Sequence, residues 1–314
     1  MTLSNAVQRY IELKQSMGSR FHTEAVILKA FYKSVGDVAV SDVNFAQVTT
    51  YLAGNGPVTR FWHRKYETLS GFYRFAIGRG YTNHSPLPTA VPQPALVFTP
   101  YIYSVCELKR LLEAVDVVDH PRAKLAPVTV RTLLLVLYGA ALRLSEALRL
   151  THDDVDLAAC LLLIRESKFY KTRWVPIGPR LNEALAAYSR EPHQRSFAKE
   201  AEATFFTTRT GEPVTVQQVE RAFYRVRKQA AVSRNDGGRY QPRLHELRHS
   251  AAVHRVVDWY QQGADVQRLL PQLATYLGHD HISATQRYLT MTPALLQAAN
   301  ERFEQYAQPE ITND

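Results

Sequence analysis

The first 90 residues alternate between apolar and polar positions with the period of amphipathic helices. Apolar residues recur every three to four positions, and the breaks between runs predict four short helices, over Leu3–Ser16, His22–Val35, 41–52 and 57–77. Ser41 is the expected N-cap of the third helix, and Pro57 suits the first turn of the fourth. The fourth helix is expected to turn one apolar stripe toward the core, formed by Trp62, Tyr66, Leu69, Tyr73 and Ile77.

Residues 83–100 interrupt this pattern with five prolines and almost no charge. Proline lacks a backbone donor and fixes φ, so neither a helix nor a strand is expected there. We therefore predict a helical domain over residues 1–90, a linker over 91–103 and a second domain over 104–314.

The second domain combines helical periodicity with one pair of strands. Helices are expected over residues 104–117, 129–138 and 145–150, and most of the chain after Arg180 has a helical pattern. Residues 161–165 and 172–177 are typical of two strands around a turn at Phe169 and Tyr170. The predicted fold class is mainly α with a small β component (α+β).

Composition narrows the classes of function. The chain has 314 residues, with 38 Lys and Arg against 29 Asp and Glu, which gives a net charge of +9. A hydrophobic content of 46% excludes a disordered chain, and the longest apolar run, residues 132–142, is too short to cross a bilayer. The two cysteines, Cys106 and Cys160, exclude a disulfide framework and a zinc site built from cysteines. No signal-peptide pattern is seen, so we expect no secretion.

The positive charge permits a polyanionic partner, and it is densest near the N-terminus. The first 90 residues carry 10 Lys and Arg against 5 Asp and Glu. Arg60, Arg64 and Arg74 fall together on one face of the predicted fourth helix. That face is either a contact with the phosphates or base edges of DNA or an ordinary solvated face, and the helix alone does not decide between them.

Two segments place reactive residue types in apolar surroundings. Arg143 lies between an expected buried helix and the next short helix, so it needs a partner, which Glu146 or an anionic ligand can supply. The sequence Leu277-Gly-His279 predicts a turn between helices. Tyr288 follows on a short helix, where a tyrosine is ordinarily a packing residue.

A third segment, His245-Glu-Leu-Arg248-His249, admits two incompatible interpretations. The His-Glu-x-x-His spacing matches a zinc peptidase, with Glu246 as general base and a later carboxylate such as Glu301 as third ligand. Against this, Arg248 places a fixed positive charge one turn from His245. In the other interpretation, these two residues share a helix face and bind a phosphate.

Taken together, these segments resemble the tyrosine recombinase (phage integrase) family over nearly the whole chain. The family's G-L-R-x-x-E motif matches Ala141-Leu-Arg143-Leu-Ser-Glu146, and its K-x-x-K-x-R-x-V-P-L-G hairpin pattern matches residues 168–178. Its H-x-L-R-H box matches residues 245–249, its L-G-H motif matches 277–279, and Tyr288 stands at the spacing of the nucleophile. In two departures, Ala141 replaces a common glycine, and the stretch from Arg248 to His279 is several residues longer than usual.

The resemblance implies a helical core-binding (SAM-like) DNA-binding domain followed by a tyrosine-recombinase catalytic domain with a C-terminal helix. It implies DNA cutting and rejoining through a 3′-phosphotyrosyl intermediate, with no metal, no ATP and no other cofactor. In that reaction, the arginines hold the phosphate, a hairpin lysine protonates the leaving oxygen, and His249 is structural. Lys171 is the alternative to Lys168, which is the lysine that the family pattern selects for this role. The implied catalytic set is Arg143, Lys168, His245, Arg248, His279 and the nucleophile Tyr288.

The resemblance also implies partners. These are double-stranded DNA with specific core sites, three further copies of the chain in a homotetramer on DNA, and accessory or sister recombinases. The expected setting is a mobile element in the bacterial cytoplasm, with the protein on the nucleoid and not in a membrane. Residues 292–306 are typical of a helix with one apolar face, which docks either on its own domain or on a neighbour's.

Three other functions would also use parts of this sequence. A type IB topoisomerase uses related chemistry but relaxes one duplex instead of exchanging two. A zinc metallopeptidase would use His245, Glu246 and His249. A catalytically silent DNA-binding protein would not need the complete set of reactive residues that the chain carries.

Overall fold

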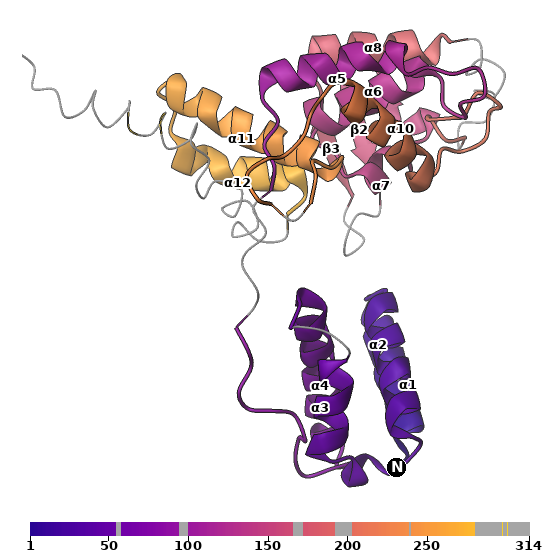
Figure 1. Ribbon diagram of the computed structural model, residues 1–314, viewed down its shortest axis with the longest axis vertical. Coiled ribbons are helices and arrows are strands. Elements are labelled where there is room, and N and C mark those ends of the chain that lie inside the picture. The colour runs from indigo at the N-terminus through magenta and orange to yellow at the C-terminus, as the bar shows by residue number, and fades with distance from the viewer. Residues whose placement is uncertain are drawn as a thin grey trace, which may run out of the picture. The chain divides into compact units, whose positions relative to one another are not determined.

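The computed structural model describes residues 1–54, 58–93, 100–165, 172–191, 203–238 and 240–279, with Gln297 and Asn300. The chain folds as two compact units, Met1–Phe98 and Thr99–Asp314, and their boundary falls inside the proline-rich segment (Figure 1). The expectations for Lys168, Lys171 and Tyr288 lie outside the described residues, and so does the expected helix over residues 292–306 apart from Gln297 and Asn300. No helix in the described ranges has the length and apolar character needed to cross a membrane.

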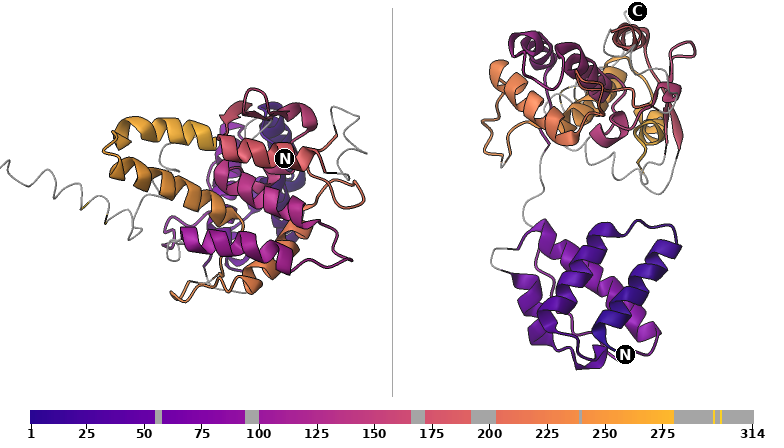
Figure 2. Two further views of the ribbon diagram at one scale, coloured as in Figure 1. Left: turned by 90° about the horizontal axis from the view of Figure 1, so that it is seen from above. Right: turned by 90° about the vertical axis from the view of Figure 1, so that its right-hand side faces the viewer.

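The regular elements in the described part of unit 1 are helices. Its elements are α1 (Leu3–Ser16), α2 (His22–Val35), a 3₁₀ turn (Val40–Asp42), α3 (Phe45–Ala53) and α4 (Arg60–Gly78) (Figure 2). Helix α4 packs against α1, α2 and α3. Large apolar side chains fill the space between the helices, among them Tyr10, Leu28, Phe31, Leu69 and Phe72.

Two local predictions in unit 1 are wrong. Ser41 is not the N-cap of α3, because it lies in the 3₁₀ turn and Val43 after it is buried. Asn44 is the cap instead, accepting from the backbone N–H of Gln47 at 3.0 Å while the Gln47 side chain accepts from the Asn44 backbone at 2.9 Å. Ile77 is 41% exposed, since it follows the last buried turn of α4.

Unit 2 begins with a three-helix segment and a small antiparallel sheet. The helices are α5 (Val105–Val117), α6 (Pro127–Gly139) and the single turn α7 (Leu144–Ala147). A 3₁₀ turn (His152–Asp154) leads into β1 (Val155–Asp156), β2 (Leu161–Ile164) and β3 (Arg173–Pro176), which pair in that order. The pair β2–β3 confirms the predicted hairpin, with Leu162 opposite Val175 and Ile164 opposite Arg173. The two-residue strand β1 was not predicted.

The remaining described elements are α8 (Pro179–Ser189), α10 (Val216–Gln229), α11 (His245–Gln261) and α12 (Val266–Leu277). Helix α6 is the centre of unit 2, because it packs against α5, α8, α10 and α11. Helices α11 and α12 run side by side (Figures 1 and 2). They enclose a small core of their own, which Ala141, at the end of α6, joins.

Candidate functional site

The site begins at the corner between α6 and α7. Ala141 has a left-handed backbone with φ of 50°, a conformation that favours glycine. The family's usual glycine at this position therefore has a conformational reason. The corner turns the chain so that Arg143 precedes α7, where its backbone N–H donates to Glu146 Oε2 at 3.0 Å. Its guanidinium Nη1 donates to Glu146 Oε1 at 2.6 Å. Glu146 is thus the partner that the sequence offered as one alternative.

Arg248 enters the same place from the first turn of α11. Its side chain is 2% exposed. Nη1 donates to the carbonyl of Ala141 at 2.7 Å, and Nη2 donates to the carbonyl of Leu277. Nη1 also lies 3.7 Å from Glu146 Oε2. The left-handed residue Ala141 therefore offers its carbonyl to Arg248, and the second arginine, Arg143, follows two residues later in the chain.

The C-terminal turn of α12 closes the site with three consecutive carbonyls. That of Tyr276 accepts from Arg173 Nε at 3.1 Å, that of Leu277 from Arg248, and that of Gly278 from Arg143 Nη2 at 3.1 Å. The last carbonyls of a helix have no partner within it and carry partial negative charge, so cations are favoured there. The turn continues directly into His279, whose N–H donates to the carbonyl of Ala274 at 2.9 Å.

Glu146 is the common counterion of these arginines. Its side chain is 1% exposed. Arg173 contributes two more hydrogen bonds, from Nη1 to Oε1 at 3.3 Å and from Nη2 to Oε2 at 3.0 Å. Burial raises the pKa of the carboxyl, but the hydrogen bonds and charges of Arg173 and Arg143 outweigh it and bring the pKa to about 2. The carboxylate is therefore ionised at neutral pH.

The charges of the site do not balance within the described residues. Three guanidiniums meet one carboxylate, and the helix end adds roughly half a negative charge. An excess of roughly one and a half positive charges is left, which suits an anion. Arg143 is the arginine best placed to reach one, because its side chain is 28% exposed.

Two histidines on α11 are neutral at physiological pH. Burial, then the charges of Arg248, Arg143 and Arg243, lower the pKa of His245 to about 4. Burial and the neighbouring His245 lower the pKa of His249 to about 3. Their rings meet edge to face with centroids 4.6 Å apart. A neutral imidazole can accept a proton, and an anion bound beside it would raise its pKa.

The structure therefore brings together Arg143, His245, Arg248 and His279 from the predicted set. Sequence reasoning gave no role to Arg173, although it stands in the K-x-x-K-x-R pattern. Where side chains are described, no group of three or more His, Cys, Asp and Glu is arranged to hold a metal. Glu246 is engaged by Arg243, whose backbone N–H and Nη2 donate to it at 2.7 and 3.1 Å.

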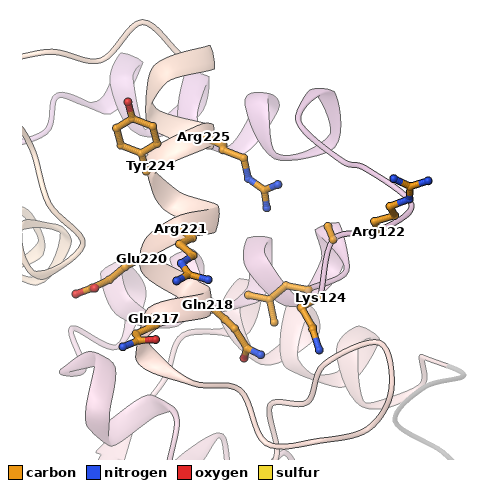
Figure 3. A pocket seen from close by; sticks show the side chains of 10 residues that line it. Arg122, Lys124, Gln217, Gln218, Glu220, Arg221, Tyr224 and Arg225 are labelled. Carbon is orange, nitrogen blue, oxygen red and sulfur yellow. The ribbon is translucent and has the colours of Figure 1, made fainter.

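A second cationic feature lies on α10 and was not predicted. A groove of about 650 Å³ separates α10 from the loop before α6. Arg225 extends from α10 toward the loop that carries Arg122 and Lys124, Arg221 lines the groove close to α10, and Glu220 points away from the groove (Figure 3). The spacing of four residues between the two helix arginines was the available sequence signal. We call this cavity, with the four cationic side chains that line it, the α10 groove.

The three arginines of unit 1 have unequal surroundings. Arg60, Arg64 and Arg74 are all exposed on α4. Arg64 Nη2 pairs with Glu24 Oε1 on α2 at 2.8 Å, so its charge is partly neutralised. A DNA contact by this face stays a prediction.

Comparison with known proteins identifies the family. The model of the phage integrase family matches residues 105–294, which include the α6–α7 corner, the hairpin, α11 and the end of α12. The chain belongs to the phage integrase family of tyrosine recombinases. The recombinase resembles the putative integrase/recombinase y4rE of Sinorhizobium fredii, with 34% identity over 96% of this chain and 95% of that one.

Solved structures share the fold of this recombinase. The Tn1549 transposon integrase in complex with transposon right end DNA has 15% identity and a TM-score of 0.71, over 98% of this chain and 100% of that one. A lambda integrase tetramer bound to a Holliday junction has 18% identity and a TM-score of 0.63, over 92% of this chain and 77% of that one. The predicted fold class is confirmed.

Proposed function

We propose that this recombinase cuts and rejoins DNA through a 3′-phosphotyrosyl intermediate, with Tyr288 as the nucleophile. The observation that carries the proposal is the excess of positive charge that the described residues leave where three arginines share Glu146 next to His279. A phosphodiester is the anion of a DNA backbone, and permanently charged guanidinium forks match its non-bridging oxygens. No metal is needed when fixed cations already offset the charge that develops on the phosphorus oxygens.

Each residue has one step in this mechanism. Arg143 and Arg248 hold the non-bridging oxygens, and His279 donates a hydrogen bond to one of them. The Tyr288 oxygen attacks phosphorus, the bond to the 5′ oxygen breaks, and Lys168 protonates the leaving 5′-hydroxyl. His245 accepts the tyrosine proton, because its imidazole is neutral at pH 7. Rejoining reverses these steps with the 5′-hydroxyl of another strand, so no ATP is consumed.

The proposed substrate is double-stranded DNA with a core site, held by several copies of the chain. The lambda integrase tetramer on a Holliday junction and the transposon integrase on transposon-end DNA support this by similarity of fold. We propose that the phosphate backbone of the DNA contacts the α10 groove and the arginine face of α4. Integration or excision of a mobile element is the outcome that fits the names of these relatives, and the cytoplasm is the compartment where such DNA is found.

The nucleophile is tested with a nicked suicide substrate and a denaturing gel. Wild-type protein should form a covalent adduct, and Tyr288→Phe should bind the same DNA without forming it. Tyr276 is the rival hydroxyl, but burial raises its pKa and it contacts the carbonyls of Gly139 and Pro176. Loss of the adduct in Tyr276→Phe and its persistence in Tyr288→Phe would reassign the nucleophile.

The outcome is tested with a plasmid that carries two copies of the site. A recombinase produces exchanged products from the two copies. Relaxation of supercoils with no exchange would identify a topoisomerase instead.

A further inference from the structure

Arg173, the first residue of β3, has a side chain that is 11% exposed, compared with 28% for Arg143 and 2% for Arg248. All three of its guanidinium nitrogens are engaged: Nη1 and Nη2 donate to Glu146, and Nε donates to the carbonyl of Tyr276. It therefore joins α7, β3 and the end of α12 through one planar group.

The residue after α12 is shaped by this arginine. Gly278 has a left-handed backbone with φ of 64°. A Cβ placed there would lie 2.7 Å from Arg173 Nη1 and 2.8 Å from its Cζ, far inside van der Waals contact. The glycine is required twice, once for its backbone conformation and once to leave space for the guanidinium. The L-G-H motif and the arginine of the hairpin motif are thus two halves of one contact.

This contact fixes the groups on either side of it. The Gly278 carbonyl accepts from Arg143, and His279 follows it in the chain. The Glu146 carboxylate that holds Arg173 also holds Arg143 and lies against Arg248. Loss of the Arg173 fork removes two donors from the carboxylate and one from the helix end, so His279 and both phosphate-binding arginines lose a common support.

We propose that Arg173 is a positioning residue, which aligns Arg143, Arg248 and His279 for strand cleavage without contacting DNA. The inference rests on the proposed function, since it assigns these three residues to the phosphate. Small displacements of catalytic groups are costly, and a shift of about 1 Å can slow a reaction by about 100-fold.

The test compares cleavage with binding in Arg173→Ala and Arg173→Lys. Lysine keeps the charge but cannot reach both Glu146 oxygens and the Tyr276 carbonyl with a planar fork. Both variants should form the covalent adduct about 10- to 100-fold more slowly, with unchanged affinity for the same DNA. Added guanidinium ion should restore part of the rate in Arg173→Ala, which a general loss of stability would not allow.

Arg165→Ala is the matched control. This arginine lies just past β2 on the same hairpin, and its guanidinium pairs with the buried carboxylate of Asp154 at 2.5 Å. Its loss removes an ion pair from the same sheet and should leave the rate of adduct formation unchanged. A fall equal to that of Arg173→Ala would make the effect a general one of the hairpin and would overturn the proposal.

A double-mutant cycle with Gly278→Ala tests the contact itself. If the Arg173 side chain is what an alanine at 278 strikes, Gly278→Ala should slow cleavage less in the Arg173→Ala background than in wild type. Equal effects in both backgrounds would contradict the contact.

The other possible outcomes of the Arg173 experiments would overturn the proposal. If DNA affinity falls as much as cleavage in both Arg173 variants, the arginine contacts DNA. If Arg173→Lys does not fold, the residue is structural, and wild-type cleavage by Arg173→Ala removes any role. Absence of an adduct with wild-type protein would instead reject the proposed function, so the two failures are distinguishable.

Discussion

Replacing Glu146 by glutamine removes the carboxylate that three arginines share. A pKa that falls from an ordinary value of 4.5 to about 2 on folding corresponds to about 3 kcal/mol of stability at neutral pH. Because the folded-state pKa is the lower one, this stability is present above about pH 4.5 and is lost as the pH falls through about 2. Less than half of it, about 1.4 kcal/mol, is left at pH 3.

Urea unfolding at pH 7 and pH 3 measures this difference. The chain has three tryptophans, so a Trp62→Phe background leaves Trp174 and Trp259, both in unit 2, as fluorescent probes. In that background Glu146→Gln should lower the free energy of unfolding by about 3 kcal/mol at pH 7 and by less than half as much at pH 3. It should also abolish or strongly slow adduct formation, because the arginines lose their common anchor.

Asp154→Asn is the control for this experiment. Asp154 is also buried in unit 2, where it accepts hydrogen bonds from the Arg165 guanidinium and from the backbone N–H of Thr151. This variant should lose stability and keep cleavage. Equal stability of Glu146→Gln and wild type at pH 7, or a difference that stays the same at pH 3, would refute the account of Glu146 as a charged counterion.

Three further predictions follow from the geometry. Ala141→Gly should raise the free energy of unfolding by up to about 1 kcal/mol by relieving the left-handed alanine, and a glycine variant no more stable than Ala141→Val would contradict this. In NMR titrations of the free protein, His245 and His249 should stay neutral from pH 8 to pH 5, since their pKa values are about 4 and 3; a midpoint near 6.5 for either would show that it is not desolvated. DNA affinity should fall steeply with salt, and Arg221→Gln with Arg225→Gln should reduce that slope by about one each if both contact phosphates, so an unchanged slope would exclude the α10 groove from the interface.

Much of the fold follows from local patterns. The capping pair of Ser104 and Glu107 places the start of α5 where the sequence predicts it, and the hairpin strands are found because alternation and turn residues are local signals. The start of α3 was misplaced, since Ser41 and Asn44 are both good caps and only the burial of Val43 selects the second. Strand β1 is two residues long, too short to produce a pattern.

The residues of the site were likewise predicted only where the signal is local in the sequence. Arg143, Arg248 and His279 are found through motifs that are short and contiguous. The role of Arg173 is not, because it depends on a carbonyl 103 residues away and on a carboxylate 27 residues away. The α10 groove likewise joins a loop and a helix that are far apart in the sequence, with 97 positions from Lys124 to Arg221. No spacing rule along the chain reveals such proximity.

The shared carboxylate also governs how this enzyme can be altered. Arginines that share one acidic anchor do not respond to substitution independently, so the effect of changing one of them depends on whether the others are intact. Libraries that aim to redirect the enzyme to new DNA targets should therefore leave Glu146, Arg173 and Gly278 fixed as a block, and place diversity on exposed surfaces, where changes combine additively.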